Sequence, residues 1–93
     1  MKIRWTPEAL RDRLAIFDYI AEDAPAAAVR LDELFSESVN RLSRHPGLGQ
    51  PGKIEGTREL IPHQSYRIVY EVHQETVWIL TLVHIARQWP PVN

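Results

Sequence analysis

Three residues in the last third of the chain have side chains suited to acid–base or phosphate chemistry: Arg67, His84 and Arg87. An imidazole titrates at about pH 6.5 and can move a proton, whereas a guanidinium offers a planar fork of N–H donors that fits a phosphate. Arg87 follows His84 by three residues, so both can reach one area, and Lys53 and Arg58 could complete a basic rim around it. We therefore take Arg67, His84 and Arg87 as candidate catalytic residues, and Lys53 and Arg58 as candidate target-binding residues.

These residues also have structural roles open to them. A single histidine at the end of a strand is more often hydrogen-bonded within the fold than catalytic, and this applies to His84. Arg67 could pair with Glu59 or Glu71 instead of binding phosphate. Both alternatives stay open from the sequence.

Composition excludes several classes of protein. The chain has 93 residues, no cysteine and 44% apolar residues, which predicts one small domain over residues 1–93, without a disulfide or a thiolate metal site. No metal-ligand spacing, phosphate-binding glycine loop or Ser-His-Asp order occurs, so we expect neither a metal nor a cofactor. Without a signal-peptide pattern or a membrane-length apolar run, we expect a cytoplasmic protein that does not bind membranes.

The net charge of −1 is unevenly distributed. Residues 1–40 hold five Lys/Arg and eight Asp/Glu, giving −3, and residues 41–93 hold six and four, giving +2. This mild polarity favours an anionic partner for the C-terminal half, but it is not the basic patch that drives non-specific nucleic-acid binding.

The candidate residues lie on or beside three strand-like segments. Residues 65–72 alternate with a period of two, which is typical of a half-buried strand, and residues 77–83 are apolar on both faces, which is typical of a covered central strand. An earlier run, Arg58–Ile61, ends at Pro62, which cannot donate to a ladder. The short connection at 73–75 suits a hairpin, so these segments predict a three-stranded antiparallel meander.

Two amphipathic helices precede the meander. Lys2–Trp5 is expected to form a short strand, and Thr6 followed by a proline and a glutamate is typical of a helix start. Pro25, with Asp23 as its cap, is expected to begin the second helix. The expected apolar stripes are Leu10, Leu14, Phe17 and Ala21 on the first helix, and Ala27, Leu31, Leu34, Phe35 and Leu42 on the second.

The order β-α-α-β-β-β predicts an α+β fold in which the helical hairpin packs on one face of a mostly antiparallel sheet. Residues 45–52 contain three glycines and two prolines, so they are expected to form a loop between the helices and the meander.

The second face of the last strand needs a cover. Strict alternation divides residues 77–83 into one face with Val77, Ile79 and Val83 and another with Trp78, Leu80 and Leu82. Either the tail and long side chains cover the second face, or it forms a groove that receives a partner segment. Trp89 has two corresponding fates, as a cover for the sheet or as an anchor for a target, and we favour the first.

Five stretches together resemble the RelE/ParE family of toxins from bacterial toxin–antitoxin modules. They are Trp5-Thr-Pro-Glu-Ala9, Arg44-His-Pro-Gly-Leu-Gly49, Arg58-Glu-Leu60, Tyr66-Arg-Ile-Val-Tyr-Glu-Val72, and the ending with Val83-His84, Arg87 and Trp89-Pro90. They span nearly the whole chain, and their order and spacing are more specific than any one of them. The resemblance implies a small sheet with a helical hairpin, in agreement with the pattern of elements.

The resemblance also implies a partner and two alternative targets. In that family an antitoxin from the neighbouring gene wraps and neutralises the toxin, and here we expect it to bury Leu34, Trp78 and Leu82. RelE-like members cut mRNA in the ribosomal A site, whereas ParE-like members poison DNA gyrase. The third alternative is a small binding module without toxic activity, or a degenerate member of the family.

Residue by residue, the resemblance leaves these mechanisms open. Arg67 and Arg87 fall where RelE-like nucleases keep arginines, and Arg58 falls where they keep a lysine. Leu60 stands at the position of a second lysine, and the tyrosine of the RelE-like tail has no counterpart before Asn93. The acidic net charge also argues against docking on ribosomal RNA.

Overall fold

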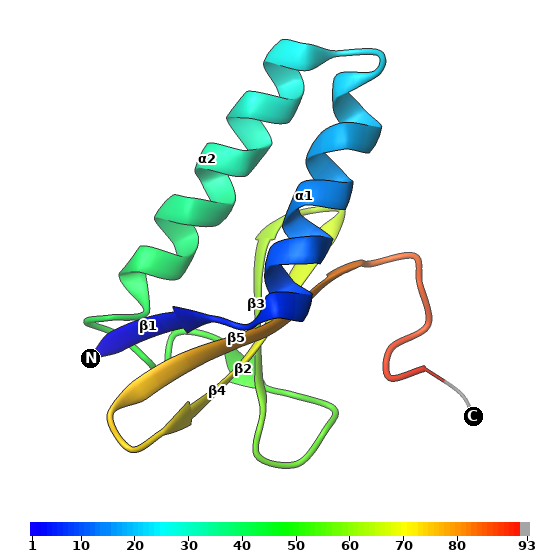
Figure 1. Ribbon diagram of the computed structural model, residues 1–93. Coiled ribbons are helices and arrows are strands. Elements are labelled where there is room, and N and C mark those ends of the chain that lie inside the picture. The colour runs from blue at the N-terminus through cyan, green and yellow to red at the C-terminus, as the bar shows by residue number, and fades with distance from the viewer. Residues whose placement is uncertain (92–93) are drawn as a thin grey trace.

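The computed structural model describes residues 1–91 and shows two helices on one face of a five-stranded sheet (Figure 1). The elements are β1 Lys2–Trp5, α1 Pro7–Ala21, α2 Pro25–Arg41, β2 Gln50–Pro51, β3 Arg58–His63, β4 Tyr66–His73 and β5 Thr76–His84. The predicted α+β class and element order are confirmed. No helix in this part of the chain is long and apolar enough to cross a membrane.

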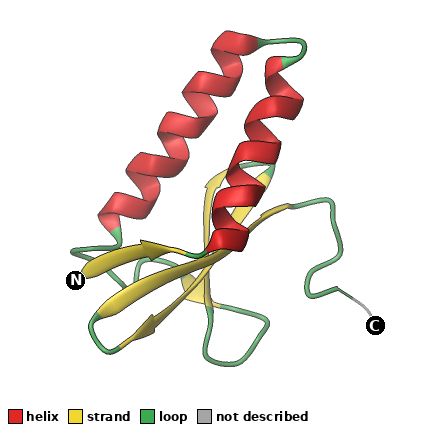
Figure 2. Cartoon of the chain, viewed as in Figure 1, coloured by secondary structure: helices red, strands yellow, loops and turns green. Residues whose placement is uncertain are grey.

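The sheet is mixed, with the strand order β1-β5-β4-β3-β2. Figure 2 shows its strands in yellow beside the two red helices. β3, β4 and β5 form the predicted antiparallel meander, and β1 runs parallel to β5, with Ile3 opposite Val77. The sequence does not predict β2, which lies in the segment 45–52 that was expected to be loop throughout. β2 is an edge strand of two residues, a position in a sheet where Pro51 is tolerated.

The helices begin close to the predicted residues. The Thr6 side chain accepts a hydrogen bond from the backbone N–H of Ala9 at 3.2 Å and caps α1. α2 begins at Pro25, but the prediction that Asp23 caps it is wrong, because Ala24 occupies the cap position and no side chain bonds there. Pro25 lacks an N–H, so this helix start has one donor fewer to satisfy.

An ion pair fixes the helical hairpin. Nε and Nη2 of Arg13 on α1 donate to the two carboxylate oxygens of Asp32 on α2, at 2.6 and 2.9 Å. The same guanidinium lies 4.9 Å from the ring centre of Trp5 at the end of β1. Arg13 therefore connects both helices with the first strand.

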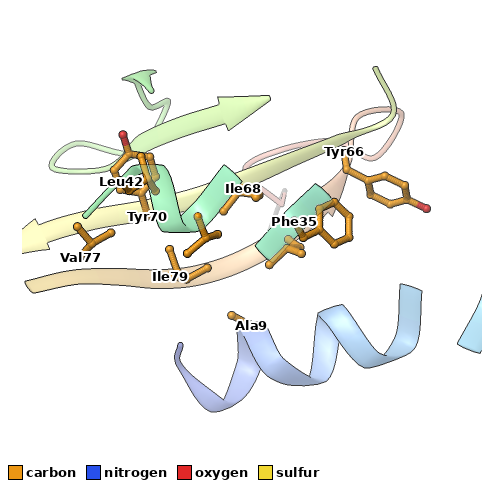
Figure 3. Packing of buried hydrophobic residues seen from close by; sticks show 10 residues of the cluster. Ala9, Phe35, Leu42, Tyr66, Ile68, Tyr70, Val77 and Ile79 are labelled. Carbon is orange, nitrogen blue, oxygen red and sulfur yellow. The ribbon is translucent and has the colours of Figure 1, made fainter. Parts of the chain in front are cut away.

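The core lies between the helices and the sheet (Figure 3). Its buried members are Ala9, Phe35, Val39, Leu42, Tyr66, Ile68, Tyr70, Val77, Ile79 and Leu82. The stripe expected on the first helix is wrong in its N-terminal half, because Leu10 and Leu14 are 50% and 61% exposed. Ala9 and Ile16 face the core instead.

A bulge in β5 changes which of its residues face the helices. The pairs that flank it are Val69 with Thr81 and Tyr70 with Ile79. Leu80 is the extra residue between them, so the alternation shifts by one position beyond it. The expected placement of Leu82 beside Trp78 is therefore wrong, since Leu82 joins the core on the helix side and is 5% exposed.

Hydrogen bonds from α1 hold this bulge. Thr6 Oγ1 donates to the carbonyl oxygen of Leu80 at 3.1 Å, and Asp12 accepts from Thr81 Oγ1 at 2.5 Å and from the backbone N–H of Leu82 at 3.2 Å. These contacts also set the rotation of α1, which explains why Leu10 and Leu14 point away from the sheet.

β3 continues through its proline. It was expected to end at Pro62, but it reaches His63, which pairs with Tyr66, while Leu60 pairs with Ile68. Between these two pairs, β3 has two residues and β4 has one. The missing N–H of Pro62 therefore falls where the ladder is already irregular.

Candidate functional site

A buried ion pair lies on the sheet face opposite the helices. Arg67 Nη1 donates to Glu59 Oε1 at 2.8 Å, and the two side chains are 12% and 5% exposed. They share this face because Glu59 pairs with Val69, two residues from Arg67 along β4. Arg67 Nε is buried without a hydrogen-bond partner among the residues described. The arginine expected to hold phosphate thus bonds a carboxylate of its own sheet.

Glu59 joins the loop and the tail to this pair. Its Oε2 accepts hydrogen bonds from the backbone N–H of Lys53 at 3.0 Å and from the indole Nε1 of Trp89 at 3.1 Å. Burial by itself would raise the pKa of Glu59, but these hydrogen bonds, together with the hydrogen bond and charge of Arg67, lower that pKa below its ordinary value. Glu59 is therefore ionised at neutral pH.

Two predicted target-binding residues meet at this carboxylate. Trp89 folds back to the sheet, as favoured from the sequence, and is half-buried. Lys53 reaches Glu59 through its backbone, while the residue as a whole is exposed. Their roles in target binding stay predictions.

Arg58 holds the loop between α2 and β3. Its Nε donates to the carbonyl oxygen of Gly49 at 2.9 Å, and its Nη2 donates to that of Gly47 at 3.1 Å. Tyr70 Oη donates to the Pro46 carbonyl oxygen at 2.8 Å and accepts from the Gly49 N–H at 2.9 Å. These bonds occupy the guanidinium of Arg58 within the fold.

A second candidate site, which we call the aromatic groove, lies between α1 and the ends of β4 and β5. It has a volume of about 390 Å³ and is lined by Asp12, Ala15, Ile16, Tyr19, Tyr66, Leu82, His84 and Arg87. The rings of Tyr66 and His84 meet edge to face, with centres 5.1 Å apart. Burial, and to a smaller extent Tyr19, raises the pKa of Tyr66. The sequence reasoning missed Asp12 and Tyr19, although helical spacing places them on the same side of α1.

His84 and Arg87 come together in the aromatic groove, as their spacing predicts. His84 Nδ1 accepts a hydrogen bond from the backbone N–H of Ala86 at 3.0 Å, so the neutral ring carries its proton on Nε2. The Arg87 side chain makes no hydrogen bond or ion pair within residues 1–91. Arg67 lies on the opposite sheet face, so the three candidate catalytic residues do not line one site.

The three residues expected to contact an antitoxin lie on different surfaces. Leu34 lines a depression of about 300 Å³ between α2 and His63. Trp78 is 37% exposed on the sheet face opposite the helices, and Leu82 lines the aromatic groove. Only a partner that wraps around the chain could contact all three, and this remains a prediction.

A known family accounts for nearly all of these elements. The family described as "ParE toxin of type II toxin-antitoxin system, parDE" matches residues 3–89. The chain belongs to the ParE toxin family. The resemblance identified from the sequence is thereby confirmed at the level of the wider ParE/RelE group.

Individual relatives of this ParE-family chain support the same assignment. Protein Y4kP of Sinorhizobium fredii is 41% identical over 92 residues, which cover 98% of this chain and 95% of Y4kP. Toxin RelE2 of Caulobacter vibrioides is 34% identical over 86 residues, covering 92% and 97% of the two chains. The solved structure of the chromosomal ParDE TA system from P. aeruginosa matches with a TM-score of 0.81 at 25% identity, over 91% of this chain and 96% of that chain.

Proposed function

We propose that this toxin inhibits growth by binding DNA gyrase rather than by cutting mRNA. The observation that supports the proposal is the ion pair between Arg67 and Glu59. In a nuclease, the arginine must offer free N–H donors where charge develops on the phosphate. In this chain the Glu59 carboxylate accepts from Arg67 Nη1 at 2.8 Å and neutralises its charge, and a phosphate placed there would be repelled by Glu59.

Two features of the whole chain support the same proposal. A protein that docks on ribosomal RNA needs an excess of basic residues, whereas this chain has a net charge of −1. Leu60 also replaces a lysine that the resemblance to RelE-like nucleases would require. The family description that matches residues 3–89 is that of ParE toxins.

Ribosome-dependent mRNA cleavage is the second candidate function. It is favoured by the aromatic groove, where His84 could move a proton and Arg87 could stabilise charge on a phosphate. The relative named toxin RelE2 is consistent with this alternative. In that case the reaction would take place in the aromatic groove, and Arg67 would take no part in it.

A cognate antitoxin is the proposed partner under either mechanism. The matching structure from P. aeruginosa is described as a ParDE TA system, which supports such a partner for this chain. Neither mechanism, as proposed, requires a metal or a cofactor.

The test measures growth and two purified activities. The chain is first produced in bacteria without its antitoxin, and growth arrest is expected. The purified chain is then added to gyrase with relaxed plasmid, and to a purified translation system in which mRNA ends are mapped. We expect supercoiling to be blocked while mRNA ends stay unchanged.

The other outcomes separate the alternatives. If the natural chain produces new mRNA ends and Arg87→Ala does not, the chain cleaves mRNA and the proposal of gyrase inhibition is wrong. Growth that continues normally, with the protein present in soluble form, would leave only the non-toxic binding module.

A further inference from the structure

We infer that this chain forms a homodimer in which α1 of one copy packs antiparallel against α1 of a second copy across a twofold axis. The contact surface, which we call the outer face of α1, consists of Leu10, Arg11, Leu14, Ala15, Asp18 and Tyr19. The inference goes beyond the proposed function and does not rest on it, because self-association is independent of the target that the toxin binds.

Two rows of side chains, each with a spacing of four residues, form this outer face. One row contains Leu10, Leu14 and Asp18, and the other contains Arg11, Ala15 and Tyr19; all six residues are exposed. Residues four apart lie one above the other on a helix, so the two rows run side by side along α1.

The fold does not bury the apolar members of the outer face. Leu10, Leu14 and Tyr19 are 50%, 61% and 75% exposed, although helical spacing predicts the two leucines for the core. The hydrogen bonds of Thr6 and Asp12 to β5 hold α1 in a rotation that keeps these leucines away from the sheet. The fold thus fixes an apolar surface on the outside of the helix, and burying it against a partner is favourable.

The charged members of the outer face have no partner within one copy. Arg11 and Asp18 make no ion pair among residues 1–91, and two helical turns separate them, which exceeds the spacing at which side chains of one helix meet. Glu8 lies three residues before Arg11 but forms no ion pair with it in the same part of the chain. Glu22 lies four residues after Asp18, and such a like-charge spacing is unfavourable. A cation from a second copy would relieve that repulsion.

An antiparallel second copy makes the two rows complementary. When the twofold axis passes between Leu14 and Ala15, each row faces the other row of the second copy. Leu10 then faces Tyr19, Leu14 faces the small Ala15, and Asp18 faces Arg11. Because the twofold axis repeats every contact, two ion pairs flank an apolar centre in which the rows of both helices pack together.

The charges also decide the direction of the second copy. In a parallel arrangement Arg11 would meet Arg11 and Asp18 would meet Asp18, which is repulsive. In the antiparallel arrangement Glu22, at the C-terminal end of α1, comes beside Pro7 at the N-terminal end of the second α1. The helix dipole favours a negative charge at that end.

The interface is small, so the dimer is expected to be weak. α1 has 15 residues and is about 22 Å long, and a single helix pair of this length is at the small end of specific interfaces. We expect a Kd on the order of 10 µM. Ala15 and Tyr19 also line the aromatic groove, so the second copy lies beside that groove.

The experiment measures self-association of the purified chain by sedimentation equilibrium, from about 1 to 200 µM. Arg11→Asp and Asp18→Arg each bring like charges together across the twofold axis, and the double variant exchanges the two charges. Arg30→Asp is the control, because Arg30 is an exposed arginine on α2 that lines a different depression, beside His63. It changes the net charge as much as Arg11→Asp does. Thermal melting checks that each variant folds.

We expect the natural chain and Arg30→Asp to dimerise alike. Each single variant of the outer face should raise Kd by about tenfold or more, since the twofold axis turns one substitution into two repulsive contacts. The double variant should return to within about threefold of the natural Kd, because the exchanged charges attract each other again.

The other outcomes overturn the inference, and none of them bears on growth arrest or gyrase inhibition. If the natural chain stays monomeric up to about 200 µM, the homodimer does not form. If it dimerises and the folded single variants dimerise equally well, the contact lies on another surface. If Arg30→Asp weakens the dimer as strongly as Arg11→Asp, the outer face of α1 is not the specific contact. If the double variant stays as weak as the single variants, Arg11 and Asp18 do not face each other and the antiparallel register is wrong.

Discussion

Glu59 on β3 and Arg67 on β4 are diagonal neighbours on one sheet face, and their side chains meet at 2.8 Å. Such diagonal neighbours are within reach of long side chains. Burial makes the pair costly to form, so its net contribution to stability is small. Removing one partner, however, leaves the other as a buried charge without a counter-ion. Through Lys53 and Trp89 the same carboxylate fixes the loop before β3 and the tail after β5.

Removing the negative charge of this pair should destabilise the fold. We expect Glu59→Gln to lower the free energy of unfolding at pH 7 by about 3 kcal/mol, since Arg67 would keep a buried charge without a counter-ion. Urea unfolding measures the change. Glu71→Gln is the control, because Glu71 lies on the neighbouring strand β4 and is half-buried, but it has no ion pair in the described structure. Equal stability of the two variants would contradict a structural role for the pair.

The stabilisation from Glu59 should depend on pH in a defined direction. The pKa of Glu59 is lower in the folded chain than its ordinary value of 4.5. The contribution is therefore complete above about pH 4.5 and is lost as the pH falls through the lower folded pKa. The difference between the unfolding free energies of the natural chain and Glu59→Gln, measured from pH 7 to pH 3, should become smaller toward the acidic end. A constant difference over this range would contradict the assigned shift.

The loop before β2 should tolerate a methyl group at one glycine and not at another. A Cβ on Gly49 would lie 2.8 Å from the Tyr70 hydroxyl and from the Glu59 carbonyl oxygen, whereas a Cβ on Gly47 meets nothing within 4 Å. We expect Gly49→Ala to destabilise by about 1–3 kcal/mol, and Gly47→Ala to change stability by less than about 0.5 kcal/mol. Thermal melting of both variants checks this, and an undisturbed Gly49→Ala would mean that the loop can shift away from Tyr70.

Local signals in the sequence are sufficient for the main elements. Thr6 and Pro25 indicate where the helices begin, and alternation indicates the meander, because caps and strand periods depend on neighbouring residues. The bulge at Leu80 depends instead on bonds from Thr6 and Asp12, about 70 residues earlier in the chain. No local pattern indicates such contacts, so the predicted face of Leu82 and the N-terminal half of the predicted stripe of α1 are both wrong.

In the candidate site too, features that depend on neighbouring residues could be predicted, and features that depend on contacts between distant residues could not. His84 and Arg87 are three residues apart, and the sequence correctly predicts that they share an area. Alternation places Arg67 on a definite face of β4, but it does not show that the tail positions Arg87 toward the helices. The contact between Trp89 and Glu59 joins residues 30 positions apart, and it depends on the path of the tail after β5.

The final prediction concerns Trp89, whose indole N–H donates to the buried carboxylate of Glu59 at 3.1 Å. Trp89→Phe keeps an aromatic ring but removes this donor, so we expect a loss of about 1.5–3 kcal/mol in stability, the range for a hydrogen bond to a charged group. The pKa of Glu59 should also rise, since one of the bonds that lower it is lost.

Trp78→Phe is the matched control, because Trp78 is 37% exposed and its indole makes no hydrogen bond within the described residues. Its stability should change by less than about 0.5 kcal/mol. Urea unfolding gives both stabilities, and the gyrase supercoiling assay gives both activities. If Trp89→Phe were as stable as the natural chain but no longer inhibited gyrase, Trp89 would serve the target-binding surface. If it loses stability while the remaining folded protein still inhibits, the indole belongs to the fold, and the tail holds Glu59 and Arg67 in place.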